Sequence, residues 1–290
     1  MIKHLVLLLI ISGMIAGCNF PEQEAPADSS LDSQPKGSLY IIGGGKRPPE
    51  MVREMVTLSN VKKEGYVCIL PMASSEPDTA FYYAARQFRD QNADHVFNFY
   101  RDSTRIFDRA LLDSLRNASL IYISGGVQEK FMDLVLNTPI HTAIREAYRK
   151  GAMIAGTSAG AAVMGRKMIT GNEFKHPEYT GDFRTIEAEN IEIKRGLGLL
   201  ENCIIDQHFI RRMRMNRLIA AAIENPDETC IGIDESTAII VRGNNATVTG
   251  LSQVVVIRNG SGSAKVKDGL LGSEGLELSI YIPGDRFLLR

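Results

Sequence analysis

Several features that mark common kinds of functional site are missing from this sequence. Its four cysteines include no C-x-x-C pair, and no H-E-x-x-H motif occurs, so the pattern favours neither a structural zinc site nor a zinc protease. The 33 basic and 34 acidic residues give a formal net charge of −1, which leaves no basic excess to follow the phosphates of a nucleic acid. We therefore expect no metal ion, no cofactor and no nucleic-acid partner.

The apolar run near the amino terminus is short. It covers residues 5–11, too few to span a bilayer. Lys3 precedes this run and Ala16-Gly17-Cys18 follows it, so residues 1–17 resemble the signal peptide of a bacterial lipoprotein. In such proteins the signal is removed and the cysteine, here Cys18, carries the lipid. An ordinary secretory signal, in which Cys18 has no special part, is the alternative.

Residues 18–37 separate this leader from the rest of the chain. They are rich in Pro, Ser, Asp, Glu and Gln, a composition that favours a flexible tether over a packed core. The lipoprotein interpretation predicts an extracytoplasmic protein anchored to a bacterial membrane, either at the outer membrane or on the periplasmic side of the inner membrane. Residues 38–290 then form the main domain.

The main domain has the hydrophobic pattern of an α/β protein. Apolar segments of strand length alternate with helical stretches, which predicts a largely parallel central sheet covered on both faces, a three-layer sandwich. The strands are expected at residues 39–42, 66–70, 95–99, 120–124, 152–156, 203–206 and 229–233, and helices at 50–59, 79–89, 109–116 and 140–150. Short strands with Gly and Asn turns after residue 237 predict an antiparallel C-terminal extension.

The segment Gly156-Thr157-Ser158-Ala159-Gly160 has the spacing G-x-S-x-G between an expected strand and an expected helix. In this arrangement a serine hydroxyl projects at the carboxyl edge of the sheet, and the flanking glycines leave room for the backbone. Ser158 is therefore a candidate nucleophile. An ordinary glycine-flanked connection, in which the serine only caps the helix, is the alternative.

A serine nucleophile needs a base and a group that orients the base. His208 ends an apolar strand inside Asp206-Gln207-His208, at the carboxyl edge where such sheets gather catalytic groups. Asp234 and Glu235 end the next expected strand, and either could face His208. The order serine, histidine, acid is that of class I glutamine amidotransferases, with serine in place of cysteine.

Five segments together resemble the cyanophycinase and dipeptidase E group of serine peptidases, peptidase family S51, and the cyanophycinases most. They have the family's order along the chain and cover most of it between residues 39 and 241. The segments are residues 41–45 (IIGGG), 123–128 (ISGGVQ), 155–162 (AGTSAGAA), 206–217 (DQHF and the arginines after it) and 232–238 (GIDESTA).

This resemblance implies a role for each matching residue. It assigns Ser158 as nucleophile, His208 as general base and Glu235, ahead of Asp234, as the residue that orients His208. The backbone N–H groups of Gly126 and Ala159 are the expected oxyanion donors, because a glycine at a strand end lets its N–H turn toward the substrate. The expected substrate contacts are Gln128, Asp206, Gln207, Arg212, Arg214 and Arg217.

Some of these arginines have another interpretation. Residues 211–217 are expected on a helix, whose period spreads the arginines over more than one face, so about half of them could serve in salt bridges instead.

The roles of two further segments are left open by the sequence. Gly43-Gly44-Gly45 is expected as a tight turn beside the site, and residues 171–195 as a long insertion, either a lid, a specificity loop or a solvated excursion.

The resemblance implies hydrolysis of β-aspartyl-arginine, cyanophycin-like isopeptides through an acyl-enzyme. An aspartyl dipeptidase of the dipeptidase E type is one alternative, and a lipoprotein that binds ligand without turnover is another. Because members of this family often dimerise, a homodimer is also expected.

Cys68, Cys203 and Cys230 have apolar neighbours and are expected in the core, where one disulfide is allowed and none is required.

Overall fold

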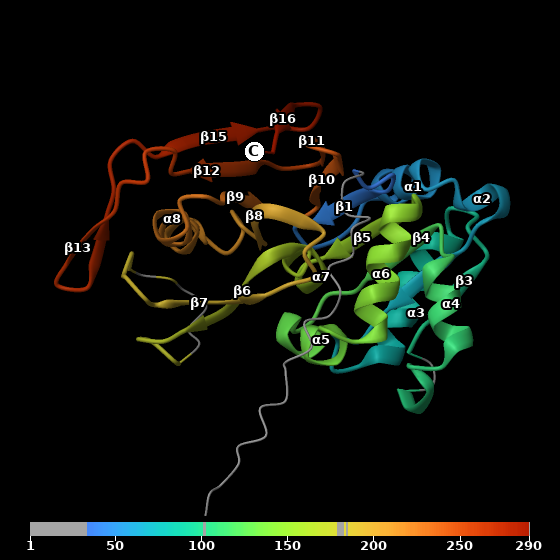
Figure 1. Cartoon of the computed structure of the whole chain (residues 1–290). Coiled ribbons are helices and arrows are strands. Elements are labelled where there is room, and N and C mark those ends of the chain that lie inside the picture. Colours follow the sequence, from blue (N-terminus) through green and yellow to red (C-terminus); the bar gives the residue numbers. More distant parts are fainter. Residues whose placement is uncertain (1–33, 101–102, 179–182, 184, 290) are drawn as a thin grey trace, which may run out of the picture. The chain divides into compact units, whose positions relative to one another are not determined.

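The computed structural model describes residues 34–289 except 101–102, 179–182 and 184. Its larger sheet has eight strands in the order β16-β11-β10-β1-β5-β4-β2-β3 (Figure 1). The five strands from β1 to β3 in this order run parallel; β10 pairs antiparallel with β1, β11 with β10 and β16 with β11. The bounds are β1 Ser38–Ile42, β2 Val67–Leu70, β3 Val96–Asn98, β4 Leu120–Ile123, β5 Met153–Thr157, β10 Thr237–Arg242, β11 Asn245–Gly250 and β16 Arg286–Leu288.

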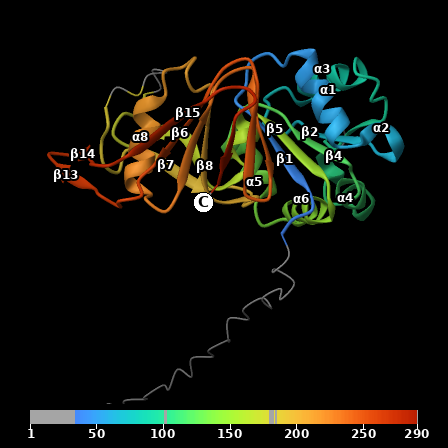
Figure 2. The same ribbon diagram turned by 90° about the horizontal axis from the view of Figure 1, so that it is seen from above.

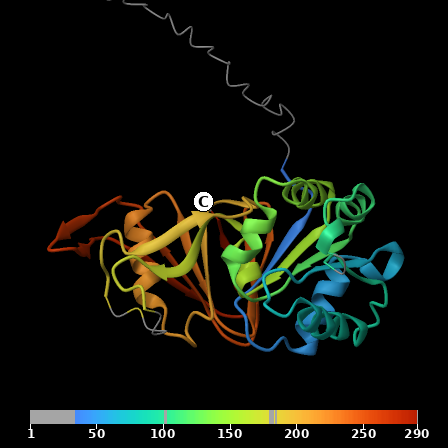
Figure 3. The ribbon, with the colours of Figure 1, turned by 90° about the horizontal axis from the view of Figure 1, so that it is seen from below.

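Helices cover both faces of the parallel strands, which explains why those strands are apolar throughout. Helices α1 (Pro49–Leu58), α2 (Val61–Glu64) and α3 (Pro77–Arg89) lie on one side, and α4 (Arg109–Arg116), α5 (Gln128–Val135) and α6 (Pro139–Lys150) on the other (Figures 2 and 3). Proline stands in the first turn of α1, α3 and α6, where its missing N–H breaks no helical hydrogen bond.

A second sheet of six strands has the order β15-β12-β9-β8-β6-β7. Helix α8 (Met215–Glu224) packs against it with an apolar face, and the hairpin β13–β14 projects at one end (Figure 2). The bounds are β6 Gly165–Glu173, β7 Ile191–Arg195, β8 Leu200–Gln207, β9 Thr229–Ile233, β12 Val254–Arg258, β13 Lys265–Lys267, β14 Leu270–Gly272 and β15 Glu277–Tyr281, with short helices at η1 Ser103–Arg105 and α7 Ala159–Ala162.

The α/β sandwich with antiparallel C-terminal strands is thus confirmed, and the seven expected strands all form. They divide between two sheets, because β8 and β9 pair with each other in the second sheet. Within each sheet the carboxyl ends are aligned: Ile42 pairs with Thr157, and Gln207 with Ile233. The segments that carry Ser158, His208 and Glu235 therefore leave three strands at such ends.

One local expectation is refined by the structure and another differs from it. The stretch 171–195 begins and ends in strand, since β6 reaches Glu173 and β7 starts at Ile191, and residues 174–190 connect these two strands. The arginine-rich stretch is not helical from its start, because helix α8 begins only at Met215. His208 and Met213 have positive φ angles of 50° and 48°, which interrupt a right-handed helix.

No helix in the described part of the chain is both long and apolar enough to cross a membrane. The lipidation site expected at Cys18 lies outside the described residues.

Candidate active site

Ser158 lies at a sharp turn between β5 and α7. Its backbone has φ 53° and ψ −112°, a strained conformation for a residue with a side chain. Only glycine fits at the two glycine positions of the G-x-S-x-G motif, because a side chain there would clash with the backbone. A Cβ atom on Gly156 would lie 2.2 Å from the carbonyl oxygen of Gly160, and one on Gly160 would lie 2.3 Å from that of Ile123. The motif therefore folds as a tight turn that presents the serine hydroxyl.

His208 and Glu235 complete a chain of hydrogen bonds to this serine. The Ser158 Oγ lies 2.8 Å from Nε2 of His208, and Nδ1 of His208 lies 2.6 Å from Oε1 of Glu235. Because a carboxylate only accepts hydrogen bonds, Nδ1 carries the proton and Nε2 is left to accept from the serine hydroxyl. This is the tautomer that a general base for Ser158 requires.

The strand-end glycines Gly43 to Gly45 hold the segments that carry His208 and Glu235. The carbonyl oxygen of Gly43 accepts from the N–H of His208 at 2.6 Å, and that of Gly44 from the N–H of Ser236 at 2.9 Å. A Cβ atom on Gly45 would lie 2.8 Å from Cβ of Glu235. The sequence predicted only a turn beside the site here; three successive glycines at a strand end are the signal for such close approach.

The two neighbouring acids after β9 have different tasks. Glu235 contacts His208, whereas the Oδ1 of Asp234 accepts from the N–H groups of Ile210 and Arg211, and its Oδ2 from the hydroxyl of Ser252. Asp234 thus holds the turn that follows His208. The structure brings Glu235, the acid that the family resemblance indicated, to the histidine.

The pKa of His208 is lowered from its ordinary value near 6.5. Burial is the largest cause, because it disfavours the charged imidazolium. The hydrogen bond to Glu235 raises the pKa in part, and the positive charge of Arg212 lowers it again. At neutral pH the imidazole is therefore uncharged and able to take a proton.

The two expected oxyanion donors flank the serine. Ala159 is the first residue of α7, where a backbone N–H has no acceptor within the helix. Gly126 has φ 142°, and a Cβ there would lie 2.1 Å from the carbonyl oxygen of Ala73. The preceding Gly125 approaches Ser158, since its Cβ would lie 3.4 Å from Cβ of that residue. The oxyanion role of both N–H groups stays a prediction.

Gln207 and Gln128 are differently placed relative to the nucleophile. The Oε1 of Gln207 lies 3.5 Å from the Oγ of Ser158, so this side chain is at the reacting position. The side-chain amide nitrogen of Gln128 instead donates to the carbonyl oxygens of Ile169 and Thr170, at 3.0 and 2.6 Å. Gln128 thereby ties α5 to β6, and its contact with substrate remains a prediction.

Asp206 and two of the arginines form a buried ionic group behind the site. Nε of Arg217 lies 2.6 Å from Oδ2 of Asp206, and Nη2 of Arg217 bonds to Oδ1. Arg214 donates to the carbonyl oxygen of Gln207 at 2.7 Å, and Arg217 also stacks on Phe183. Arg214 and Arg217 thus fit the interpretation in which the arginines serve in salt bridges. Arg212 takes no part in this group and is exposed. The group fixes the end of β8; direct contact of its members with substrate stays a prediction.

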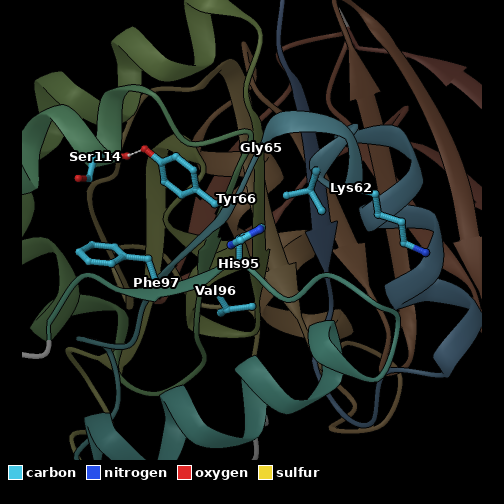
Figure 4. Close-up of a pocket in the computed structure, with 8 residues that line it drawn as sticks. Lys62, Gly65, Tyr66, His95, Val96, Phe97 and Ser114 are labelled. Atoms are coloured by element: carbon cyan, nitrogen blue, oxygen red, sulfur yellow. Dashed lines mark hydrogen bonds between the residues drawn. The ribbon is translucent and has the colours of Figure 1, made fainter.

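A cavity of about 260 Å³ opens beside Ser158. Sequence reasoning missed two of its lining residues, Arg47 and Tyr122, because neither lies in a segment with a motif. A second cavity, of about 650 Å³, is lined by Tyr66, His95 and their neighbours (Figure 4). It lies where β2 and β3 begin, at the sheet edge opposite to the one that carries Ser158.

The three cysteines in the described part of the chain are not members of the Ser158 site. Cys68, Cys203 and Cys230 are buried free thiols, and burial raises the pKa of each of them. Within the described residues, no group of three or more His, Cys, Asp or Glu side chains could hold a metal ion.

The sequence model of peptidase family S51 matches residues 39–249, from β1 to β11. The chain belongs to peptidase family S51. It is a serine peptidase, and the match spans every member of the Ser158 site.

Named relatives of this S51 peptidase agree with the family match. The chain is 33% identical over 228 residues to the cyanophycinase of Trichormus variabilis, covering 77% of this chain and 74% of that protein. It is 30% identical over 267 residues to the cyanophycinase of Geminocystis herdmanii, covering 87% and 93%. The crystal structure of a peptidase from an acI-B1 Actinobacterium has the same fold, with a TM-score of 0.64 at 21% identity over 88% of this chain and 98% of that one.

Proposed function

We propose that this S51 peptidase hydrolyses β-aspartyl-arginine isopeptides of the cyanophycin type through an acyl-enzyme. The observation that carries the proposal is the hydrogen-bonded chain from Ser158 through His208 to Glu235. The substrate class is supported by the relatives named cyanophycinase, which resemble this chain over most of its length.

In this proposal each residue of the site has a step. Ser158 Oγ attacks the carbonyl carbon while Nε2 of His208 takes its proton, and the same nitrogen then protonates the leaving amine. Glu235 stabilises the imidazolium that forms between these steps. The N–H groups of Ala159 and Gly126 bind the oxyanion. Water, activated by His208, releases the acyl group and restores the serine.

We further propose that the enzyme is exported and held on a bacterial membrane through a lipid at Cys18. The support is the order of basic start, apolar run and cysteine in residues 1–18. A flexible tether at residues 18–37 would let the peptidase domain reach a large substrate near the membrane surface.

Incubation of the purified full chain with cyanophycin, followed by mass spectrometry of the products, tests the proposed substrate. We expect β-aspartyl-arginine units, released by hydrolysis of the aspartyl backbone bonds that join them, and none with the Ser158→Ala variant. The same assay with short α- and β-aspartyl dipeptides separates the two peptidase candidates. Cleavage of dipeptides together with intact cyanophycin would contradict the proposal and favour a dipeptidase of the dipeptidase E type.

A further inference from the structure

Several polar side chains that the catalytic steps leave unused line the cavity beside Ser158, together with glycines, alanines and Tyr83. Arg47 reaches it from the loop after β1, Tyr122 and Ser124 from the end of β4, and Thr157 from the end of β5. Ser158 itself forms part of the wall. A group bound in this cavity would therefore lie next to the reacting hydroxyl.

Arg47 brings an uncompensated positive charge to this wall. Its Nε donates to Oε1 of Gln87 at 2.7 Å, and its Nη1 lies 3.4 Å from the carbonyl oxygen of Gly45 and from Oγ1 of Thr157. All three partners are neutral. Among the described residues, no carboxylate forms a salt bridge with this guanidinium, so its charge is available to an anionic ligand.

Tyr122 adds a buried hydroxyl that has no hydrogen-bond partner in the described part of the chain. The side chain is only 2% exposed, and its ring packs edge-on against Phe88. A phenylalanine would fill the same space without the penalty of an unpaired polar atom. Burial raises the pKa of Tyr122, and the charge of Arg47 and the nearby Thr157 side chain lower it in part.

We propose that this cavity is a specificity subsite that binds a carboxylate of the substrate, with Arg47 as its ionic partner and the Tyr122 hydroxyl as a hydrogen-bond donor. A carboxylate supplies what both residues lack, because it is an anion that only accepts hydrogen bonds. The inference rests on the proposed function for the identity of Ser158 as nucleophile. It deepens that function by placing an acidic group of the peptide beside the scissile bond.

Direct binding tests the subsite without any turnover. Calorimetric titration of succinate into the full chain carrying Ser158→Ala should show saturable binding, whereas uncharged succinamide should not bind. Adding Arg47→Met should weaken succinate binding at least about tenfold, and Tyr122→Phe about fivefold, as expected for hydrogen bonds to a charged group. Arg47→Lys, which keeps the charge, should retain part of the affinity.

Arg53 provides a matched control. Its Nε also bonds to a glutamine, Oε1 of Gln91 at 3.3 Å, but it does not line the cavity. Arg53→Met should bind succinate like the parent protein. Because Tyr122→Phe removes only an unpaired oxygen, its thermal unfolding should match or exceed that of the parent, which separates loss of binding from loss of fold.

The outcomes distinguish this subsite from the proposed function. Absence of succinate binding, or equal binding by the parent and Arg47→Met proteins, would overturn the subsite while leaving cyanophycin hydrolysis to its own assay. Conversely, succinate binding that depends on Arg47 in a protein that leaves cyanophycin intact would support the subsite and contradict the proposed substrate.

Discussion

A Cβ atom placed on Gly44 would lie 2.4 Å from Cε1 of His208. The loop after β1 and the ring of the general base thus occupy adjoining space, and the histidine is held in line with Ser158 by backbone on its far side. The position of the base depends on a residue that takes no part in proton transfer.

Gly44→Ala should therefore disable the site while leaving its three catalytic residues intact. The methyl group displaces the His208 ring, and we expect kcat to fall by about a hundredfold. The φ of 108° at Gly44 adds a loss of unfolding free energy of about 1–3 kcal/mol.

Gly284→Ala is the control for this prediction. Gly284 has a similar φ of 98°, but nothing lies within 4 Å of its Cβ position. The Gly284→Ala variant should have a lower unfolding free energy than the parent protein and the same kcat. Equal kcat in the two variants, measured on one substrate, would show that Gly44 does not position the histidine.

The reactivity of Ser158 should follow the protonation of His208. Since the pKa of His208 is lowered, the rate of labelling by a fluorophosphonate should rise with pH along a limb whose midpoint is below 6.5, the ordinary value. Arg212→Gln removes a positive charge that lowers this pKa, so the midpoint should move to higher pH. Arg211→Gln, at the exposed neighbour, should leave it in place. A midpoint that does not respond to Arg212→Gln would rule out this electrostatic influence.

The two adjacent acids should have separable effects. Glu235→Gln removes the charge that stabilises the imidazolium and alters the preferred tautomer, so we expect kcat to fall by about two to four orders of magnitude. Asp234→Ala removes the acceptor of two backbone N–H groups and one hydroxyl, and should cost about 1–3 kcal/mol of unfolding free energy. Urea denaturation and steady-state kinetics of both variants check this; the opposite pattern would reverse the assignments.

The buried pair Asp206–Arg217 should be sensitive to loss of one partner. Arg217→Met removes the closer ionic partner of Asp206, which is 1% exposed, and leaves this carboxylate the longer ionic contact with Arg214 at 3.7 Å, so it should lower the unfolding free energy by about 3 kcal/mol. The double variant Asp206→Leu, Arg217→Met should lose less than Arg217→Met alone. Lys265→Met, which removes one partner of an exposed pair with Glu274, should cost less than about 1 kcal/mol. Equal losses in the two single variants, by urea denaturation, would contradict this account.

The lipid anchor at Cys18 has its own test. In a bacterial host that processes lipoproteins, the wild-type chain should incorporate labelled palmitate and sediment with membranes. Cys18→Ser should do neither. Incorporation of the label by Cys18→Ser would show that the lipid is attached elsewhere or that the leader acts differently.

Much of the fold follows from patterns that are local in the sequence. The apolar runs of β1, β2, β4, β5 and β9 and the spacing of α4 are decided within short windows, so they are predictable. The division of the strands into two sheets cannot be predicted in this way. Residues 203–205 of β8 and the whole of β9 are as buried as β1 and β5, and only pairing over long sequence distances decides which sheet each strand joins.

The candidate site, like the fold, is only partly predictable from local sequence patterns. Ser158 and His208 lie at strand ends with recognisable neighbours. The pattern alone leaves Asp234 and Glu235 as candidate acids; the family resemblance favours Glu235, and the side-chain geometry places Glu235 at His208. Arg47 and Tyr122 carry no local signal, because an arginine in a loop and a tyrosine in a strand are ordinary. Their significance appears only when the fold places them on one cavity wall beside Ser158.

The most direct test of the central claim is to map the adduct that a fluorophosphonate forms with this protein. Peptide mass spectrometry should find one modified residue, Ser158, with no adduct in Ser158→Ala and slow labelling in His208→Ala. Labelling that persists at another residue in Ser158→Ala, or proceeds at the wild-type rate in His208→Ala, would contradict an account in which His208 activates Ser158.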